Sequence, residues 1–282
     1  MTLRAEVLLD GLAFPEGPRW RDGELWFSDM HHQLVKAVDP QGRCRDVVRV
    51  ENDPSGLGWL PDGRLLVVSM RDRRLLRLDA GGLCEHADLS GIATWHCNDM
   101  LTDTQGRSYV GNFGFDYADP SQRRDASLAL VMPDGKVRVA ATDLAFPNGS
   151  VLSPDGRQLV IAESFGARLT AFDVAPDGSL SGRRVFAPLE RGETADGICL
   201  DAEGAIWVAS PASGQVLRLH EGGRVSERVE VSTRAIACML GGAQRRTLFV
   251  CSAGALDADE CRARKQGRIE AVEVEVPGAG LP

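Results

Sequence analysis

Four polar residues stand at nearly the same place relative to apolar, β-prone runs of the chain. Each lies nine to eleven residues before the start of such a run. They are Glu16, Asn98, Asn148 and Asp196. Two carboxylates and two amides offer only oxygen donors, which Ca²⁺ and Mg²⁺ prefer, whereas zinc favours nitrogen and sulfur. The pattern therefore indicates a site for a hard divalent cation, provided that the fold brings the four side chains together.

Each of these residues also has a simpler interpretation. Asn-Gly and Asp-Gly dipeptides form ordinary turns, and any one of the four alone would fit that role. Their common spacing favours joint ligation, because two carboxylates that face each other repel unless a cation lies between them. Since Ca²⁺ takes about six to eight oxygens, four protein ligands would leave positions for water and substrate.

The elements that would position these residues form a repeat. The apolar runs begin at residues 25, 65, 108, 159, 206 and 248, at intervals of 40, 43, 51, 47 and 42 residues. Repeats of this length with several short strands are typical of a β-propeller, so we predict an all-β fold with six blades in one domain, residues 1–282. A β-sandwich or a solenoid is the alternative.

In a propeller, the start of each innermost strand faces the central channel, which is where the four polar residues would meet. The sixth repeat runs out of chain before a fourth strand, and the N-terminal run Ala5–Leu9 has no partner of its own. We therefore expect Ala5–Leu9 to complete the sixth blade and to close the ring without an open edge.

Composition excludes several classes of function. The chain has 32 basic and 40 acidic residues, a net charge of -8, and no long run of Lys or Arg, which argues against a nucleic-acid partner. No stretch approaches the roughly 20 apolar residues of a membrane span, and no signal-peptide pattern opens the chain. We expect a cytoplasmic monomer or small homo-oligomer with no membrane partner. The seven cysteines lack C-x-x-C spacing, so we expect them to be reduced and mostly buried.

Several motifs carry a family resemblance. They are E-G-P-x-W followed by L-W-F-S-D in the first repeat, N-D in the third, P-N-G-x-x-x-S-P-D-G in the fourth and D-G-x-x-x-D-A-E-G-x-x-W-V-A in the fifth. Together they resemble the senescence marker protein/gluconolactonase/luciferin-regenerating enzyme (SMP-30-like) family over nearly the whole chain. The resemblance implies a six-bladed propeller with a divalent metal in the channel, usually calcium, and hydrolysis of lactones or related esters.

The resemblance also implies roles for individual residues. Glu16, Asn148 and Asp196 match the metal ligands, and Asp196 also matches the general base that activates water. Asn98 matches an asparagine that lies beside the metal and contacts the substrate. Ca²⁺ is the expected ion, with Zn²⁺, Mg²⁺ and Mn²⁺ as alternatives.

The third repeat departs from the sugar-lactone pattern. Members that act on sugar lactones carry an arginine two residues before the asparagine, whereas this chain has His96 there. A histidine cannot replace the planar, bidentate donor that an arginine offers to hydroxyl groups or carboxylates. The neighbouring aromatic residues either line a more apolar substrate pocket or simply pack in the core: Trp95, Phe113 and Phe115. The long segment Phe113–Ser127 is either an entrance lid or an inert surface loop.

The sequence therefore predicts a metal-dependent hydrolase of lactones or of cyclic or aryl esters. The metal would polarise the carbonyl group, and Asp196 would take a proton from the attacking water. Two alternatives use the same site. One is a non-catalytic propeller that binds a ligand or partner and is stabilised by its metal, and the other is an organophosphate hydrolase or a lyase.

Overall fold

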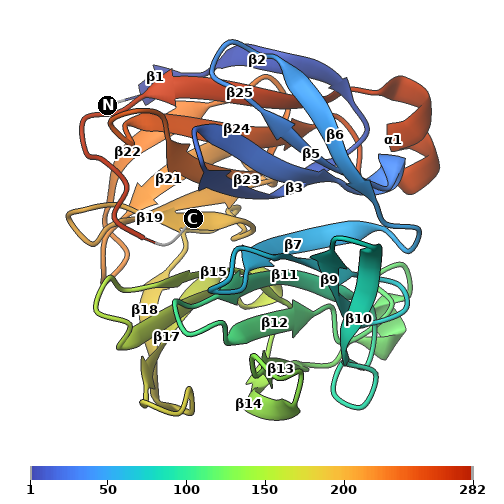
Figure 1. Ribbon diagram of the computed structural model, residues 1–282. Helices are drawn as coiled ribbons and strands as arrows, with labels where there is room; N and C mark the ends of the chain where they lie inside the picture. The colour runs from blue at the N-terminus through green and yellow to red at the C-terminus, as the bar shows by residue number, and fades with distance from the viewer. Residues whose placement is uncertain (1, 281–282) are drawn as a thin grey trace.

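The computed structural model describes residues 2–280, which fold almost entirely into β-strands. Six sheets are present, each built on four antiparallel strands that form one blade (Figure 1). Within residues 2–280, no helix has the length and apolar character that crossing a bilayer requires.

The strands of the first three blades follow one another along the chain. Blade one contains β3 (Pro15–Arg21), β4 (Glu24–Asp29), β5 (Leu34–Val38) and β6 (Cys44–Arg49). Blade two contains β7 (Pro54–Trp59), β8 (Leu65–Ser69), β9 (Arg74–Asp79) and β10 (Gly82–Asp88). Blade three contains β11 (Cys97–Thr102), β12 (Ser108–Asn112), β13 (Ala126–Val131) and β14 (Val137–Leu144).

The last three blades include the N-terminal strands. Blade four contains β15 (Pro147–Leu152), β16 (Gln158–Glu163), β17 (Arg168–Val174) and β18 (Leu180–Pro188). Blade five contains β19 (Ile198–Leu200), β20 (Ile206–Ser210), β21 (Gln215–Leu219), β22 (Val225–Glu230) and β1 (Thr2–Arg4). Blade six contains β23 (Arg234–Gly241), β24 (Thr247–Ala253), β25 (Gly267–Glu273) and β2 (Glu6–Leu12). The described helices are η1 (Met30–His32), η2 (Pro120–Gln122), η3 (Ser164–Gly166) and α1 (Ala258–Arg264).

One strand of each blade lies innermost, and these strands contact one another in a closed ring. Contacts run from β3 to β7, then through β11, β15, β19 and β23, and from β23 back to β3. A closed ring of this kind encloses a central channel. The all-β, six-bladed propeller predicted from the repeat is therefore confirmed, and the sandwich and solenoid alternatives are wrong.

The N-terminal segment closes the ring. Strand β2 pairs antiparallel with β25, so that the blue strand lies beside the red one in Figure 1. This confirms the expectation for Ala5–Leu9, although the strand begins at Glu6 and ends at Leu12. Strand β1 adds an unpredicted fifth strand to blade five, parallel to β22. One short segment thus joins two neighbouring blades through backbone hydrogen bonds.

The second strands of the blades begin within one residue of their predicted positions, at residues 24, 65, 108, 158, 206 and 247. Neighbouring blades then pack through their side chains. Trp20 of β3 stacks on Phe249 of β24, with ring centroids 5.3 Å apart and an interplanar angle of 11°. Gly241 of β23 permits this contact, because a Cβ there would lie within 2.4 Å of the Trp20 indole.

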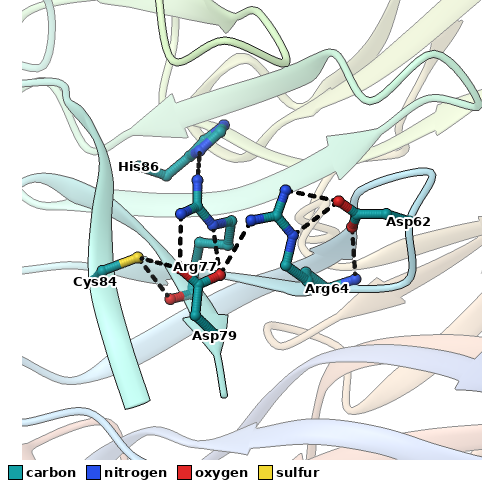
Figure 2. Close-up of polar contacts among 6 residues, drawn as sticks. All are labelled: Asp62, Arg64, Arg77, Asp79, Cys84 and His86. Atoms are coloured by element: carbon teal, nitrogen blue, oxygen red, sulfur yellow. Dashed lines mark hydrogen bonds and ion pairs between the residues drawn. The ribbon is translucent and has the colours of Figure 1, made fainter. Parts of the chain in front are cut away.

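The outer strands of blade two are held by a polar network (Figure 2). Arg77 of β9 donates two hydrogen bonds to Asp79, at 2.8 and 2.7 Å, and Arg64 donates a third at 3.2 Å. The Cys84 thiol of β10 donates to the same carboxylate at 3.1 Å. Arg77 holds the pKa of Asp79 well below its ordinary value, whereas the hydrogen bond to Asp79 raises the pKa of Cys84. All seven cysteines are free and five are buried, as the sequence predicted.

The insertion of blade three is shorter than predicted and leans on blade four. It spans residues 113–125, because Ala126 and Ser127 already belong to β13. Arg123 in this loop donates to the Phe165 carbonyl of η3 at 3.0 Å, and its guanidinium lies 5.1 Å from the Phe165 ring centroid. The loop therefore reaches the end of the propeller at which η3 lies.

Candidate functional site

The four predicted site residues lie at the same end of four innermost strands. Glu16, Asn98 and Asn148 are each the second residue of β3, β11 and β15, and Asp196 precedes β19 by two residues. The first three are buried, with exposures of 3–6%. Asp196 is more open, although its Oδ1 atom is inaccessible to solvent. The common spacing in the sequence therefore corresponds to a common position in the blades.

Neighbouring blades are tied together at this end of the channel. The Asn98 amide donates from Nδ2 to the carbonyl of Pro147 at 3.2 Å, linking blades three and four. The backbone N–H of Gly149 donates to the Asp196 carbonyl, also at 3.2 Å, linking blades four and five. The space for side chains is small here, since a Cβ on Gly149 would come within 2.5 Å of the β19 backbone. These contacts fix the relative positions of the polar side chains.

Negative charge accumulates at the site. Burial raises the pKa of Glu16 well above its ordinary value, and the nearby charges of Asp196 and Asp99 raise it further. The Gly17 N–H, which donates to Glu16 Oε2 at 2.6 Å, and the Arg19 charge oppose this rise. Burial also raises the pKa of Asp196, followed by the charge of Asp99. A cation at this position would relieve both the repulsion and the loss of hydration.

Unpaired oxygens show that the residues present fit a metal ion. Asn148 Oδ1 and Asp196 Oδ1 are both buried without a hydrogen-bond partner, which is costly unless something else satisfies them. The Asn148 amide is oriented by Ser164, whose hydroxyl accepts from Nδ2 at 3.3 Å and donates to the Ala195 carbonyl at 2.7 Å. The described residues contain no group of three or more His, Cys, Asp or Glu side chains that could hold a metal. Any ion here would be bound by the mixed set of two carboxylates and two amides.

Blade two supplies a further oxygen at the equivalent position. Ser55 is the second residue of β7, it is fully buried, and its hydroxyl oxygen has no hydrogen-bond partner. Its backbone carbonyl accepts from the Ser28 hydroxyl at 2.6 Å. Sequence reasoning did not assign Ser55 to the site, because it carries no charge and lies in a repeat without a carboxylate or amide at this position.

A buried ion pair crosses the inner strands near the site, and sequence reasoning missed it. Arg19 of β3 donates to Asp99 of β11 at 2.9 Å, and both side chains are about 5% exposed (6% and 4%). Strand β7 lies between them, and Gly56 makes the approach possible because a Cβ there would lie 2.3 Å from the Met100 nitrogen. Both residues stand inside the motifs discussed above, next to residues assigned to the site. No sequence pattern indicates that a residue of blade one pairs with a residue of blade three.

Aromatic rings form a continuous row beside the polar residues. We call Trp95, His96, Phe113, Phe146 and Phe165 the aromatic wall. Successive ring centroids lie 4.9, 6.1, 4.5 and 4.8 Å apart along this row. The structure therefore brings together three of the predicted aromatic and histidine residues and adds two that the sequence did not single out.

Phe115 and His96 differ in what they can offer a substrate. Phe115 is 4% exposed and packs against Phe146 and Phe165, with ring centroids 6.5 and 5.9 Å away, so it supports the wall from behind. His96 is half-buried. Burial, followed by the positive charge of Arg71, lowers the pKa of His96 below its ordinary value of 6.5. The imidazole is therefore neutral at neutral pH.

Comparisons with known proteins agree with the fold and the motifs. Residues 14–254, well over half of the chain, match the family described as SMP-30/Gluconolactonase/LRE-like region. A 6-deoxy-6-sulfogluconolactonase from Pseudomonas putida is 26% identical over 279 residues, which cover 95% of this chain and 93% of the relative. Regucalcin from Oryctolagus cuniculus is 31% identical over 168 residues, covering 57% of this chain and 56% of the relative.

A solved structure shows the same fold. The crystal structure of a calcium-binding protein, regucalcin from Agrobacterium tumefaciens, has a TM-score of 0.82. The similarity covers 100% of this chain and 97% of that one at 24% sequence identity. The matched region contains all four blades that carry the polar residues, so this chain belongs to the SMP-30/gluconolactonase/LRE-like family.

Proposed function

We propose that this chain is a divalent-metal-dependent hydrolase of lactones or related esters that acts at the polar end of its channel. Family membership supports lactone hydrolase activity, and the relative from Pseudomonas putida is named for such an activity. One observation carries the metal dependence. The buried oxygens of Asn148 and Asp196 have no partner and lie beside the buried carboxylate of Glu16.

The donor set favours Ca²⁺ over the alternatives. Glu16, Asn98, Asn148 and Asp196 would hold the ion through oxygen atoms alone, which suits a hard cation. The calcium-binding regucalcin with the same fold supports this choice. When bound, the ion would supply the positive charge that stabilises the negative charge developing on the substrate's carbonyl oxygen, which is worth several kcal/mol.

The chain's own residues then divide the remaining work. Asp196 accepts the proton of the attacking water, because it is a carboxylate at the centre of the site and more open than Glu16. The hydrogen bond from Asn98 to Pro147 and that from Asn148 to Ser164 hold both amides in place. Arg19 fixes Asp99, the charge that acts on both Glu16 and Asp196.

The deciding experiment removes the base and keeps the shape. Asp196→Asn preserves an oxygen donor but loses most of the basicity, so at saturating Ca²⁺ we expect turnover of a responsive lactone to fall by about 10²–10⁴-fold. The measurement is kcat across a panel of lactones and aryl esters, with metal-stripped protein as the blank. Asp177→Asn, at an exposed turn position whose side chain is 69% exposed, is the matched control and should retain wild-type turnover.

Two outcomes would overturn the proposal. Near-wild-type turnover by the Asp196→Asn variant at saturating Ca²⁺ would remove Asp196 from the mechanism. Absence of turnover by the wild type across the whole panel, together with metal-dependent binding of the same compounds, would instead identify a non-catalytic binding propeller.

A further inference from the structure

The aromatic wall is built into the same backbone that positions the candidate site. Phe146 stands two residues before Asn148, and Phe165 directly follows Ser164, whose hydroxyl accepts from the Asn148 amide. The Ser164 N–H also donates to the Phe146 carbonyl at 3.1 Å. The two rings lie 4.8 Å apart and therefore flank the contacts that orient Asn148.

The backbone at Phe146 is unusual. Its φ angle is +62°, a left-handed conformation that a bulky side chain rarely adopts. Such conformations persist where the surrounding structure requires them, and they gather at binding and catalytic sites. Here the left-handed residue places a large ring next to Phe113, at 4.5 Å and an interplanar angle of 20°.

The wall also has open faces. Trp95, His96, Phe113 and Phe146 are half-buried, and Phe165 is 42% exposed. Phe113, Phe146 and Phe165 carry no side-chain hydrogen-bond donor, and the polar atoms of the wall are those of the Trp95 indole and the His96 imidazole. Arg123 lies over the Phe165 ring and donates to the Phe165 carbonyl, and the charge of Arg71 acts on His96 near the other end of the wall.

A ring-bearing residue also stands at the equivalent position of the repeat in blade one. The residues two positions before the four candidate ligands are Phe14, His96, Phe146 and Thr194. Three are rings, and one is a hydroxyl. Phe14 continues the pattern in blade one, where its ring lies 5.4 Å from that of His31. The equivalent residue of blade two is Asp53, which pairs with Arg71 at 2.7 Å. Polar partners therefore lie on the side of blade two, and a polyhydroxylated ring would find few on the rings of blades three and four, where unpaired hydroxyl groups would lose their hydration.

We infer that the aromatic wall binds a flat apolar group of the substrate and that Phe146 and Phe165 determine this specificity. The substrate class is then a lactone or ester that carries an aryl or similarly flat substituent, rather than a sugar lactone. This inference rests on the proposed hydrolase function and names the substrate class of that site. The reacting ester would lie at the polar residues while its substituent stacks along the rings of blades three and four.

The test compares three six-membered lactones that differ outside the ester. One δ-valerolactone carries a phenyl group next to the ring oxygen, the second carries a methyl group there, and the third is gluconolactone. We expect the wild type to prefer the phenyl compound in kcat/KM. Phe165→Ala, at an exposed position, should lose about 10- to 100-fold towards the phenyl compound, mainly through KM, and change little towards the methyl compound.

Further variants keep the test decisive. Phe146→Leu retains apolar volume but removes the ring, so it should reduce the phenyl preference even if Phe146→Ala does not fold. Val185→Ala, which alters an exposed apolar residue of β18 on the same blade, is the control and should leave the rank order unchanged.

The failures of the two proposals are distinguishable. If the methyl compound or gluconolactone is hydrolysed but the phenyl compound is not preferred, or if Phe165→Ala and Phe146→Leu keep the wild-type preference, the inference is overturned and the hydrolase function stands. If none of the three is hydrolysed, binding of the phenyl compound decides the matter. If the phenyl compound quenches tryptophan fluorescence and Phe165→Ala weakens this quenching, the wall is supported as a binding surface. Equal quenching in the wild type and the variant would overturn the inference.

Discussion

At the scale of single residues, the site concentrates carboxylates where water cannot reach them. Glu16 is 4% exposed, and Asp196 and Asp99 both add negative charge to its surroundings. Only Arg19 and the Gly17 N–H act in the opposite direction. Without a cation, this arrangement destabilises the folded chain in a pH-dependent way, which provides a test of the site that needs no substrate.

Glu16→Gln should stabilise the metal-free protein, and more so as the pH rises. Because the pKa of Glu16 is raised in the folded state above its ordinary value of 4.5, the folded chain keeps a proton that the unfolded chain releases. Folding stability therefore falls with increasing pH above this value in the wild type. We expect the difference in the free energy of unfolding, variant minus wild type, to grow between pH 5 and pH 8.

Urea unfolding of metal-stripped protein at several pH values measures this difference. Glu221→Gln, which removes a negative charge at an exposed position, is the control. Added Ca²⁺ should reverse the ranking, because it stabilises the wild type more than the variant. A difference that stays constant with pH, or that shrinks, would show that Glu16 is not a strained carboxylate.

His96 is the residue at which this chain departs from the sugar-lactone pattern. Its imidazole stacks on Trp95 and is neutral at neutral pH, so it extends the aromatic wall instead of offering a fixed positive charge. His96→Arg should raise the kcat/KM for polyhydroxylated lactones relative to apolar ones, because a guanidinium donates several hydrogen bonds in a fixed geometry. Initial rates on a matched panel measure the ratio, and an unchanged rank order would exclude His96 as a specificity residue.

At the scale of elements, the inner strands are held at their positions by contacts that skip a blade. Arg19 of β3 reaches Asp99 of β11 across β7, where glycine leaves the necessary space. The backbone carbonyl of Met100 accepts a further hydrogen bond from the same guanidinium. This pair therefore links blades one and three directly, on strands that also carry Glu16 and Asn98.

Arg19→Met should strongly destabilise the protein. Removing one member of a buried pair leaves the other charge without compensation, which costs about 3–5 kcal/mol. Adding Asp99→Asn to Arg19→Met should recover part of the loss, since the orphaned charge is then gone. Thermal and chemical unfolding measure both. Arg43→Met is the control, because Arg43 is 81% exposed and its pair with Asp39 should contribute about 1 kcal/mol or less. Equal losses in the two single variants would contradict the role of the buried pair.

The sequence predicted the strands and the position of the polar residues because both follow from local patterns. Apolar runs and Gly-containing turns repeat along the chain, with D-G before β8, Q-G before β12 and E-G before β20, so these strands begin at the expected residue. Shared spacing then placed Glu16, Asn98 and Asn148 at equivalent points of three inner strands. Their role as ligands stays a prediction.

What the sequence did not predict depends on contacts between distant segments. The pairing of Arg19 with Asp99 joins residues 80 positions apart, and no periodicity encodes it. Phe165 was not singled out, because its importance arises only where η3 meets the loop of blade three. Helix α1 is short, and its start is marked only by Asp257, whose side chain accepts from the Glu260 N–H.

At the scale of the whole molecule, closure of the propeller ring depends on the N-terminal strand β2 but not on β1. Deleting residues 2–4 removes β1 but leaves blade five with four strands, whereas deleting residues 2–12 also removes β2 and exposes the edge of β25. We expect the shorter deletion to remain monodisperse, with a modestly lower Tm. The longer deletion should aggregate, because an unpaired edge strand is a template for further pairing.

Size-exclusion chromatography and thermal unfolding distinguish these outcomes. Replacing Leu9 by Pro within β2 is a milder version that keeps the length of the chain, and it should shift the protein in the same direction. If the protein without residues 2–12 behaves like the wild type in both measurements, β2 does not close the ring.

The pairing of β2 with β25 also sets the order of events during synthesis. A ribosome releases residues 6–12 long before residues 267–273, so β2 has to wait for its partner until the strands of blades one to five have emerged. Blades one to four contain only consecutive strands and can form one after another as they appear. Loop closure over such a long separation is slow, and the open edges of a half-made ring attract other chains. We therefore expect nascent chains of this protein to be most prone to aggregation in the interval before β2 pairs with β25.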